Sequence, residues 1–352
     1  RLMLLSTAAA GLVAAAVSPA FAGEVEKSVT MGGRVNRAIV VTDNGEATTV
    51  SQIDPTSVSG SRFGVNGTAK SESMTIGAHF ELGLQANPST GSQTQGAASS
   101  LNIRHSYVSI ANDMGTLKIG HTWSADALTL SNALHGTGNA GFTDGFVNSG
   151  EELRVTGTAG NGTGSSGVTV GGVGAIHGAG RQSTVVYTTP NMSGFSANLG
   201  YGQEQHGAAQ VTYGGDFDGT KVQAQGSWGS RGGTIKSEAS ASLAVALAGG
   251  LNGSVAYSKQ NRVTNATVRD PDFWSLQVGY TMGANAISLW GSQQDDAAAN
   301  GDDARTIGVT VEHQLSDYGT SIYGGVSNLD YDTTLTKYDD LTSGWVGIRV
   351  NF

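Results

Sequence analysis

The sequence of 352 residues lacks cysteine altogether, and it has little proline, 5 residues, and little charge, 13% of the chain. Without cysteine there is no disulfide framework, thiolate metal site, iron–sulfur cluster or cysteine nucleophile. Lysine and arginine number 19 against 28 acidic residues, so the formal net charge is −9. Because no basic surplus is left to neutralise a nucleic-acid backbone, we expect no nucleic-acid partner.

Long hydrophobic runs are missing beyond the first residues of the chain. The one apolar run, Leu2 to Val17, follows Arg1 and leads into Pro19-Ala20-Phe21-Ala22, a pattern typical of a secretory cleavage site. A transmembrane anchor is the alternative, but the run is short for a span of about 20 residues and has no basic cluster behind it. The sequence therefore predicts a signal peptide at residues 1–22 and an exported mature domain at 23–352.

Glycine, in contrast, is abundant, with 53 residues, although it does not recur at every third position as in collagen. Apolar and polar side chains alternate with a period of two, most cleanly from Met74 to Ala86. This alternation predicts about sixteen strands, at residues 28–41, 61–70, 73–86, 101–111, 115–123, 182–190, 193–203, 207–214, 217–229, 236–248, 250–260, 272–282, 284–294, 304–315, 318–329 and 341–352.

The connections between these strands alternate in length. Tight turns such as Asn112-Asp113-Met114 follow the even strands, whereas longer gaps follow most odd strands, and the segment 124–181 is the longest. Short turns on one rim and long loops on the other are typical of an outer-membrane barrel. A soluble β-sandwich or propeller is the alternative, but its core would need more Leu, Ile and Phe than these Ala- and Val-rich faces offer. We predict an all-β fold, a transmembrane antiparallel β-barrel.

Several motifs resemble those of the general diffusion porins of Gram-negative outer membranes. They are Gly33-Arg34-Val35, Ser61 to Gly67, Arg104 to Val108 followed by Gly115 to Gly120, Tyr187 to Phe195, and the terminal alternation that ends in Phe352. The resemblance covers nearly all of the mature chain and is that of a divergent member. It implies a homotrimer of sixteen-stranded barrels with short periplasmic turns and long extracellular loops. It also implies that the third loop, 124–181, folds into the lumen and narrows it.

A pore of this kind needs fixed charges at its narrowest point. Arg34, Arg62 and Arg104 have the parity of the polar strand faces, the last together with Asn102 and Ser106, so we expect all three arginines to point into the lumen. An arginine on the lipid face would cost about 2–4 kcal/mol. The resemblance matches the three to the basic wall of the family's constriction, to which Arg181 is added. A structural arginine paired with a wall carboxylate is the alternative for each.

The resemblance further implies carboxylates on the inward loop, across the pore from the basic wall. The chain departs here from the enteric members, because their Pro-Glu-Phe-Gly loop tip is absent. Asp144 is the preferred residue, since the aromatics and glycines around it suit a loop packed inside a barrel. The full set of acidic residues expected on the loop is Asp126, Asp144, Glu151 and Glu152.

No cofactor, metal site or enzymatic activity is expected. The histidines show no metal-ligand spacing, and no Gly-x-Ser-x-Gly elbow occurs. Acidic residues in the outer loops are a solvated charge run or, as the alternative, hold loosely bound divalent cations that bridge to lipopolysaccharide. These are Asp295-Asp296, Asp302-Asp303, Asp330, Asp332 and Asp339-Asp340.

The expected function is passive diffusion of ions and small hydrophilic solutes across the outer membrane, with a mild cation preference from the acidic surplus. A substrate-specific channel is one alternative, but it needs aromatic residues along the lumen. Several aromatics instead have the parity of the lipid face: Tyr201, Trp228, Tyr257, Tyr280 and Phe352. A surface barrel with a plugged lumen, or an outer-membrane hydrolase, are further alternatives.

The expected partners are two further copies of the chain, outer-membrane lipid and lipopolysaccharide, and the barrel-assembly machinery of the cell. Phe352 is the expected C-terminal signal for that assembly.

Overall fold

The structure is a computed structural model that describes most of the chain from residue 24 onward. The described residues are 24–89, 99–131, 134–138, 150–156, 165–173, 179–203, 206–233, 235–263, 270–296 and 301–352. The predicted signal peptide, residues 1–22, lies outside them, as does Asp144. No helix in these ranges is both long enough and apolar enough to cross a membrane.

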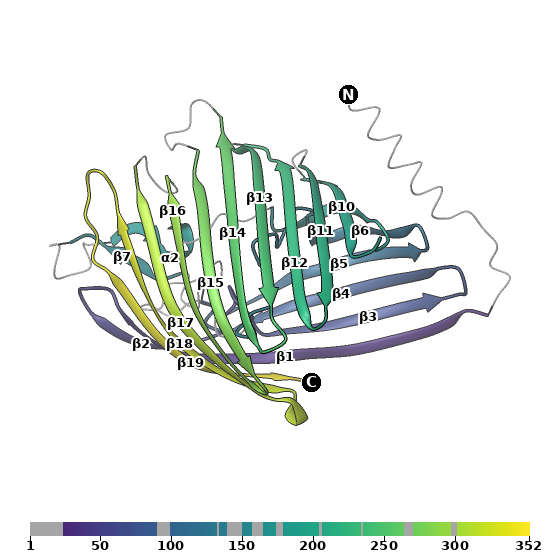
Figure 1. Cartoon of the computed structure of the whole chain (residues 1–352), viewed down its shortest axis with the longest axis horizontal. Coiled ribbons are helices and arrows are strands. Elements are labelled where there is room, and N and C mark those ends of the chain that lie inside the picture. The colour runs from purple at the N-terminus through teal and green to yellow at the C-terminus, as the bar shows by residue number, and fades with distance from the viewer. Residues whose placement is uncertain are drawn as a thin grey trace.

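Sixteen antiparallel strands form a closed barrel in which each strand pairs with its neighbours in sequence order (Figure 1). They are β1 (Glu26–Asp43), β3 (Arg62–Lys70), β4 (Thr75–Gln85), β5 (Ser100–Asn112), β6 (Gly115–Trp123), β9 (Arg181–Thr188), β10 (Phe195–Gly202), β11 (Gly207–Phe217), β12 (Thr220–Ser230), β13 (Ile235–Ala246), β14 (Leu251–Arg262), β15 (Asp272–Met282), β16 (Asn285–Asp295), β17 (Asp303–Leu315), β18 (Thr320–Asp332) and β19 (Leu341–Asn351). The predicted strand number and order are confirmed.

The first and last strands close the barrel. Residues 34–43 of β1 pair with β19, while residues 26–34 pair with β3 on the other edge. Phe352 extends the seam, because its backbone exchanges two hydrogen bonds with Gly33, of 2.9 and 3.0 Å. A side chain at position 33 would collide with the carbonyl of Arg62 and with the Phe352 ring. Glycine at this position therefore lets the terminal aromatic lie against the wall.

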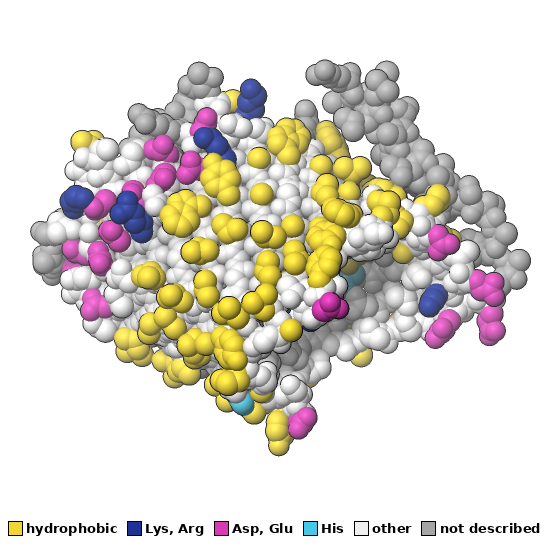
Figure 2. Space-filling view, viewed as in Figure 1, with side chains coloured by type: hydrophobic (Ala, Val, Ile, Leu, Met, Phe, Trp, Pro, Cys, Tyr) yellow, Lys and Arg dark blue, Asp and Glu magenta, His cyan; other side chains and the backbone are white. Residues whose placement is uncertain are grey.

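The two faces of the wall differ as the period-two pattern predicts. Outward side chains are apolar and exposed, for example Leu276 at 53% and Leu289 at 53%, and they spread over the face shown in Figure 2. Inward positions on these and the adjacent strands carry buried polar residues, such as Ser258, Ser288 and Thr310. An apolar outer belt and a polar interior is the arrangement that a lipid bilayer requires of a barrel.

The connections follow the predicted alternation of short and long. Asp218-Gly219, both with positive φ, make a two-residue turn between β11 and β12, the geometry that suits the twist of a hairpin. Five short elements were not predicted: β2 (Thr48–Ile53), which folds back on β1 as an antiparallel hairpin, a small sheet of β7 (Glu152–Arg154) and β8 (Ser165–Thr169), α2 (Val170–Val173) and the 3-10 helix η2 (Ser316–Tyr318). The third loop is therefore not free of strands.

The third loop lies against the inner wall. Residues 124–131 and 134–138 of its first part lie along β10 to β17 and form hydrogen bonds with their inward side chains. Thr129 Oγ1 lies 2.8 Å from Ser227 Oγ on β12, and Thr137 Oγ1 lies 3.0 Å from Ser288 Oγ on β16. Leu130 packs against the fully buried Phe273 of β15. The inward course of this loop, expected from the resemblance, is confirmed for these residues.

The second part of the third loop reaches the rim of β16 to β19. One apolar cluster joins the loop to these strands: Leu153, Val170 and Val173 of the loop pack against Trp290 and Tyr331 of the wall. The backbone nitrogen of Asp339 donates to the carbonyl of Arg154 at 2.9 Å, so the loop between β18 and β19 is tied to the same cluster. In Figure 1, β7 and α2 lie behind these strands.

Candidate functional site

Arginines gather on the inner face where β1 and β3 meet. Arg34 and Arg62 lie directly opposite each other on the two strands. Their Nε atoms donate to the same acceptor, the carbonyl of Gly60, at 3.2 and 3.4 Å. Gly60 belongs to the 54–61 segment, which folds inward beside them, since Asn36 Nδ2 donates to the carbonyl of Ser59 at 3.0 Å. A shared acceptor therefore holds the two cations side by side.

Glu81 on β4 supplies the carboxylate of this wall. Its Oε1 lies 2.6 Å from Arg104 Nε and 3.4 Å from Arg62 Nη1. The three side chains are 10 to 22% exposed, so the pairs are only partly screened by water. The wall thus contains one carboxylate that serves two arginines. Glu81 was not predicted as a site residue, although its parity on the polar face of its strand could have indicated it.

A β-bulge positions Arg104. Across β4 and β5, Glu81 faces His105 and the next residue, Leu82, faces Ile103, so Arg104 is the extra residue of the bulge. The parity of β5 changes at this point. Ser106 pairs with Phe80, which is 39% exposed on the outer face, and Tyr107 pairs with His79 of the inner face. The prediction that Ser106 faces the lumen is therefore wrong, because an unpredicted bulge reverses the alternation.

Two further arginines complete the cluster. Arg181 pairs across β6 and β9 with Trp123, and its Cζ lies 4.1 Å from the centre of the indole ring. It interacts electrostatically with Arg104 and Glu81. Arg349 on β19 donates to Ser59 Oγ at 3.3 Å and interacts with Arg34. Arg349 was not predicted, although its parity in the terminal strand could have indicated it. We call Arg34, Arg62, Arg104, Arg181, Arg349 and Glu81 the charged wall.

Asp126, Glu151 and Glu152, the predicted acidic loop residues that the structure describes, have other partners. Asp126 accepts hydrogen bonds from Ser124 Oγ at 2.5 Å and from His206 Nε2 at 3.3 Å, against β11 and β12. Burial alone would raise the pKa of Asp126, but the hydrogen bonds from His206 and Ser124 outweigh it and lower that pKa. Glu152 accepts the Gly167 backbone N–H at 2.5 Å within the small sheet.

Glu151 is 2% exposed, and its backbone carbonyl accepts the N–H of Val170. Closer to the arginines is Asp54, a residue of the inward 54–61 segment. Burial raises the pKa of Asp54, opposed by hydrogen bonds from Ser61 and by the charges of Arg37 and Arg34. Asp54 was not predicted, and its position depends on a loop conformation that strand parity does not describe.

Among the described residues, no group of three or more His, Asp or Glu is arranged to hold a metal ion. Several acids of the outer loops are engaged by the protein itself: Asp303 by Arg305, Asp332 by Lys337, and Asp302 by the hydroxyl of Tyr331. Binding of divalent cations at these loops stays a prediction.

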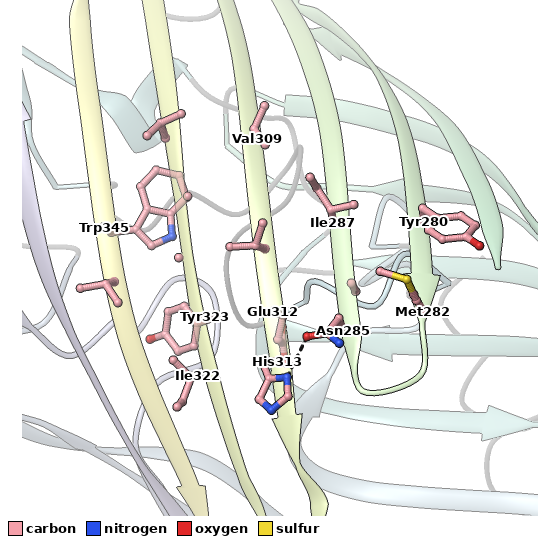
Figure 3. Close-up of a pocket in the computed structure, with 16 residues that line it drawn as sticks. Tyr280, Met282, Asn285, Ile287, Val309, Glu312, His313, Ile322, Tyr323 and Trp345 are labelled. Carbon is pink, nitrogen blue, oxygen red and sulfur yellow. Dashed lines mark hydrogen bonds between the residues drawn. The ribbon is translucent and has the colours of Figure 1, made fainter.

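A groove of about 800 Å³ opens on the outer face rather than in the lumen (Figure 3). Exposed apolar residues from neighbouring strands line it, among them Tyr280, Ile287 and Ile322. The outward position predicted for Tyr280 is confirmed, as it is for Tyr201, Trp228, Tyr257 and Phe352, which are 41 to 67% exposed.

A closed barrel with an apolar belt, a charged interior and a loop folded inside it defines an outer-membrane channel. The family model described as Gram-negative porin matches residues 4–334, and the chain belongs to this family. It is a passive diffusion channel for ions and small hydrophilic solutes in the outer membrane of a Gram-negative bacterium. The family and the fold are those of channels rather than enzymes. No curated protein matches the sequence.

Solved porin structures share the fold. The anion-selective porin from Comamonas acidovorans is 21% identical, with a TM-score of 0.63 over 93% of this chain and 100% of that one. A trimer form of OmpT from Vibrio cholerae is 16% identical, with a TM-score of 0.59 over 93% and 99% of the two chains. A triple mutant of the Rhodopseudomonas blastica porin is 14% identical, with a TM-score of 0.56 over 92% and 100%.

Proposed function

We propose that the charged wall is the selective element of the pore and that it makes the channel prefer anions. The supporting observation is the local charge: Arg34, Arg62, Arg104 and Arg181 all interact with one carboxylate, Glu81, which already pairs with two of them. Arg349, the fifth arginine, faces Glu312, and Asp54 lies near Arg34, so the arginines still outnumber the acids around them. Fixed charges at a confined, low-dielectric passage act on ions far more strongly than charges on the open surface. The net charge of −9 alone would favour cations, but many of the acids lie in the outer loops, where salt screens them.

The third loop supports this function by narrowing the passage from the opposite side. It covers the inner face of β10 to β17, which carries mostly uncharged side chains, with Glu238 and Glu312 as buried exceptions, and it is held there by Thr129, Leu130 and Thr137. Solutes are thereby directed toward the uncovered face, which carries the arginines. The predicted acidic side of the constriction is replaced in this proposal by Glu81 and Asp54, while Asp144 stays a candidate.

We also propose that the chain assembles as a homotrimer in contact with outer-membrane lipid and lipopolysaccharide, that the assembly machinery recognises Phe352, and that the chain has no catalytic activity. The trimer form of the Vibrio cholerae protein, which shares the fold, supports the first point. The exposed position of Phe352 at the barrel seam supports recognition of the terminal residue.

The test is the reversal potential of the purified protein in a planar bilayer under a KCl gradient. We expect ohmic openings that arrive in groups of three, and a reversal potential with the sign of chloride selectivity. Glu81→Gln should increase the anion preference, because two arginines lose their carboxylate. A cation-selective reversal potential would refute the role of the charged wall, and a folded protein that conducts no current would favour the plugged barrel.

A further inference from the structure

Four aromatic rings form a continuous group beside the charged wall. His79 lies on β4, His105 and Tyr107 on β5, and Trp123 at the end of β6. The centroid distances are 5.1 Å from His79 to Tyr107, 5.5 Å from His79 to His105, 6.1 Å from His105 to Tyr107 and 6.2 Å from His105 to Trp123. These separations are within the range of favourable aromatic contact. We call these four residues the ring cluster.

The ring cluster belongs to the interior of the barrel. The neighbours of Tyr107 and His79 in sequence, Val108 and Phe80, are exposed on the outer face, at 51% and 39%. Alternation along a strand therefore turns Tyr107 and His79 inward. The bulge at Arg104 brings His105 to the same side, where it faces Glu81 across the strands. The lumen therefore contains the aromatic residues that a substrate-specific channel needs. Strand parity alone did not predict the inward position of Tyr107, because the bulge on β5 reverses the alternation.

A cation lies at each end of the ring cluster. The Arg181 guanidinium stacks on Trp123 at 4.1 Å, and Lys118 Nζ lies 5.5 Å from the centre of the Tyr107 ring. Lys118 and Trp123 are five residues apart on β6, which corresponds to about 16 Å along the strand. Strict alternation would place them on opposite faces, but the contacts of Trp123, the last residue of β6, join it to the inner group: its ring lies 6.2 Å from that of His105, and the Arg181 stacked on it interacts with Glu81 and Arg104. The order along the wall is therefore a cation, a row of rings and a second cation. The rings and cations run in the direction of the strand.

The kind of solute that fits depends on which arginines already have a carboxylate partner and which do not. Glu81 is shared by Arg62 and Arg104, whereas among the described residues no carboxylate lies within ion-pair distance of Arg181. A carboxylate can accept from a guanidinium with two oxygens, while a cation would be repelled by every basic group of the charged wall. The rings offer flat, polarisable faces for stacking, which a planar solute uses better than an aliphatic one.

We propose that the ring cluster, with Arg181 and Lys118, is a binding subsite for planar aromatic carboxylates that pass through the pore. This inference rests on the proposed anion preference and adds a solute class to it. The solute has two positions: at one end its ring stacks on Trp123 while its carboxylate contacts Arg181, and at the other its ring stacks on Tyr107 while its carboxylate contacts Lys118. The second cation gives the carboxylate a further contact as the solute moves along the wall, so binding does not stop permeation.

The test compares two probes of equal charge and similar size, benzoate and cyclohexanecarboxylate, of which only benzoate is planar. Purified protein in a planar bilayer is titrated with each probe in dilute KCl, and the apparent Kd is taken from the reduction of the KCl conductance. We expect benzoate to bind roughly threefold to tenfold more tightly than cyclohexanecarboxylate. Equal Kd values for the two probes would overturn the proposal.

Two variants and a matched control locate the site. Tyr107→Leu and Trp123→Leu should each reduce the difference between the probes to less than about twofold. Trp228→Leu removes an aromatic residue of the outer face and should leave it unchanged. A heat-resistant barrel and normal KCl conductance identify the variants that have folded, and one folded variant of the pair is enough for the comparison. A probe difference that survives in a folded variant would overturn the proposal.

Failure of the subsite and failure of the anion preference give different results. If the wild-type reversal potential shows anion selectivity but benzoate has no advantage, only the subsite is refuted. If the reversal potential shows cation selectivity, the proposed function itself fails, whatever the probes do.

Discussion

The two inner walls of the barrel are built from the same alternating pattern but differ in what they present. The charged wall and the ring cluster lie on one side of the barrel, on β19, β1, β3 to β6 and β9. The wall of β10 to β17 carries small uncharged side chains along its middle, such as Gln210, Ser242 and Thr310, and the third loop bonds to them. The second wall is covered, whereas the first faces the passage.

The difference follows from what each set of side chains can bind. Hydroxyl and amide side chains form hydrogen bonds with the backbone and hydroxyl groups of a loop packed against them, and no charge has to be buried. Arginines beside one carboxylate keep unsatisfied charge, and such charge is more stable near water than under a loop. The distribution of charge between the walls therefore fixes where the loop packs and where solutes pass.

The largest expected effect comes from removing the charge of the first wall. The triple variant Arg34→Gln, Arg62→Gln, Arg104→Gln should change the sign of the reversal potential toward cations, since Glu81 and the acidic surplus then dominate. Arg305→Gln is the control, because Arg305 is 61% exposed and pairs with Asp303 at the rim. An unchanged sign in the triple variant would mean that the walls do not differ in their effect on ions.

The second prediction concerns the apolar packing between the third loop and the covered wall. Phe273→Ala empties the space beside Leu130 and Ala256, and we expect the free energy of unfolding to fall by about 3–5 kcal/mol. Urea unfolding of the folded protein in detergent measures this loss. Open-channel current noise should rise at the same time, because the loop loses its apolar contact. A stable variant with quiet openings would show that hydrogen bonds alone fasten the loop.

The stability that the contact between the third loop and the covered wall contributes should also depend on pH. His135, 6% exposed between the loop and the wall, has its pKa lowered by burial from the ordinary 6.5 to about 4. The unfolded chain takes up this proton below about pH 6.5 and the folded chain only near pH 4, so stability is full above pH 6.5 and is lost as the pH falls toward 4. The loss is about 3 kcal/mol. In His135→Gln this part of the pH dependence of urea unfolding should disappear.

The smallest effect is expected at the rim. The ion pair between Arg305 and Asp303, at 2.5 Å, is largely exposed, and exposed pairs contribute between about 0 and 1 kcal/mol. Arg305→Ala should therefore shift the midpoint of urea unfolding only slightly, and less at high salt. A loss comparable to that of Phe273→Ala would show that the rim stabilises the barrel as strongly as the covered wall does.

Parts of the site were predictable and parts were not. Arg34 and Arg62 could be placed in the lumen, because their strands alternate without interruption. Tyr107 could not, since the bulge at Arg104 reverses the parity after it. Asp126 has loop chemistry that suits a constriction, yet it binds Ser124 and His206 because the loop path places it beside β11 and β12. Nothing in a local pattern specifies that path.

The sequence by itself determined the strands, their number and order, the apolar belt and the position of the long third loop, because alternation and turn chemistry act between residues that are close in the chain. The tertiary structure alone decided which carboxylate meets the arginines, which wall the loop covers and which rings come together. Those contacts join strands and loops far apart in sequence, and they depend on register, on one bulge and on closure of the barrel between β1 and β19.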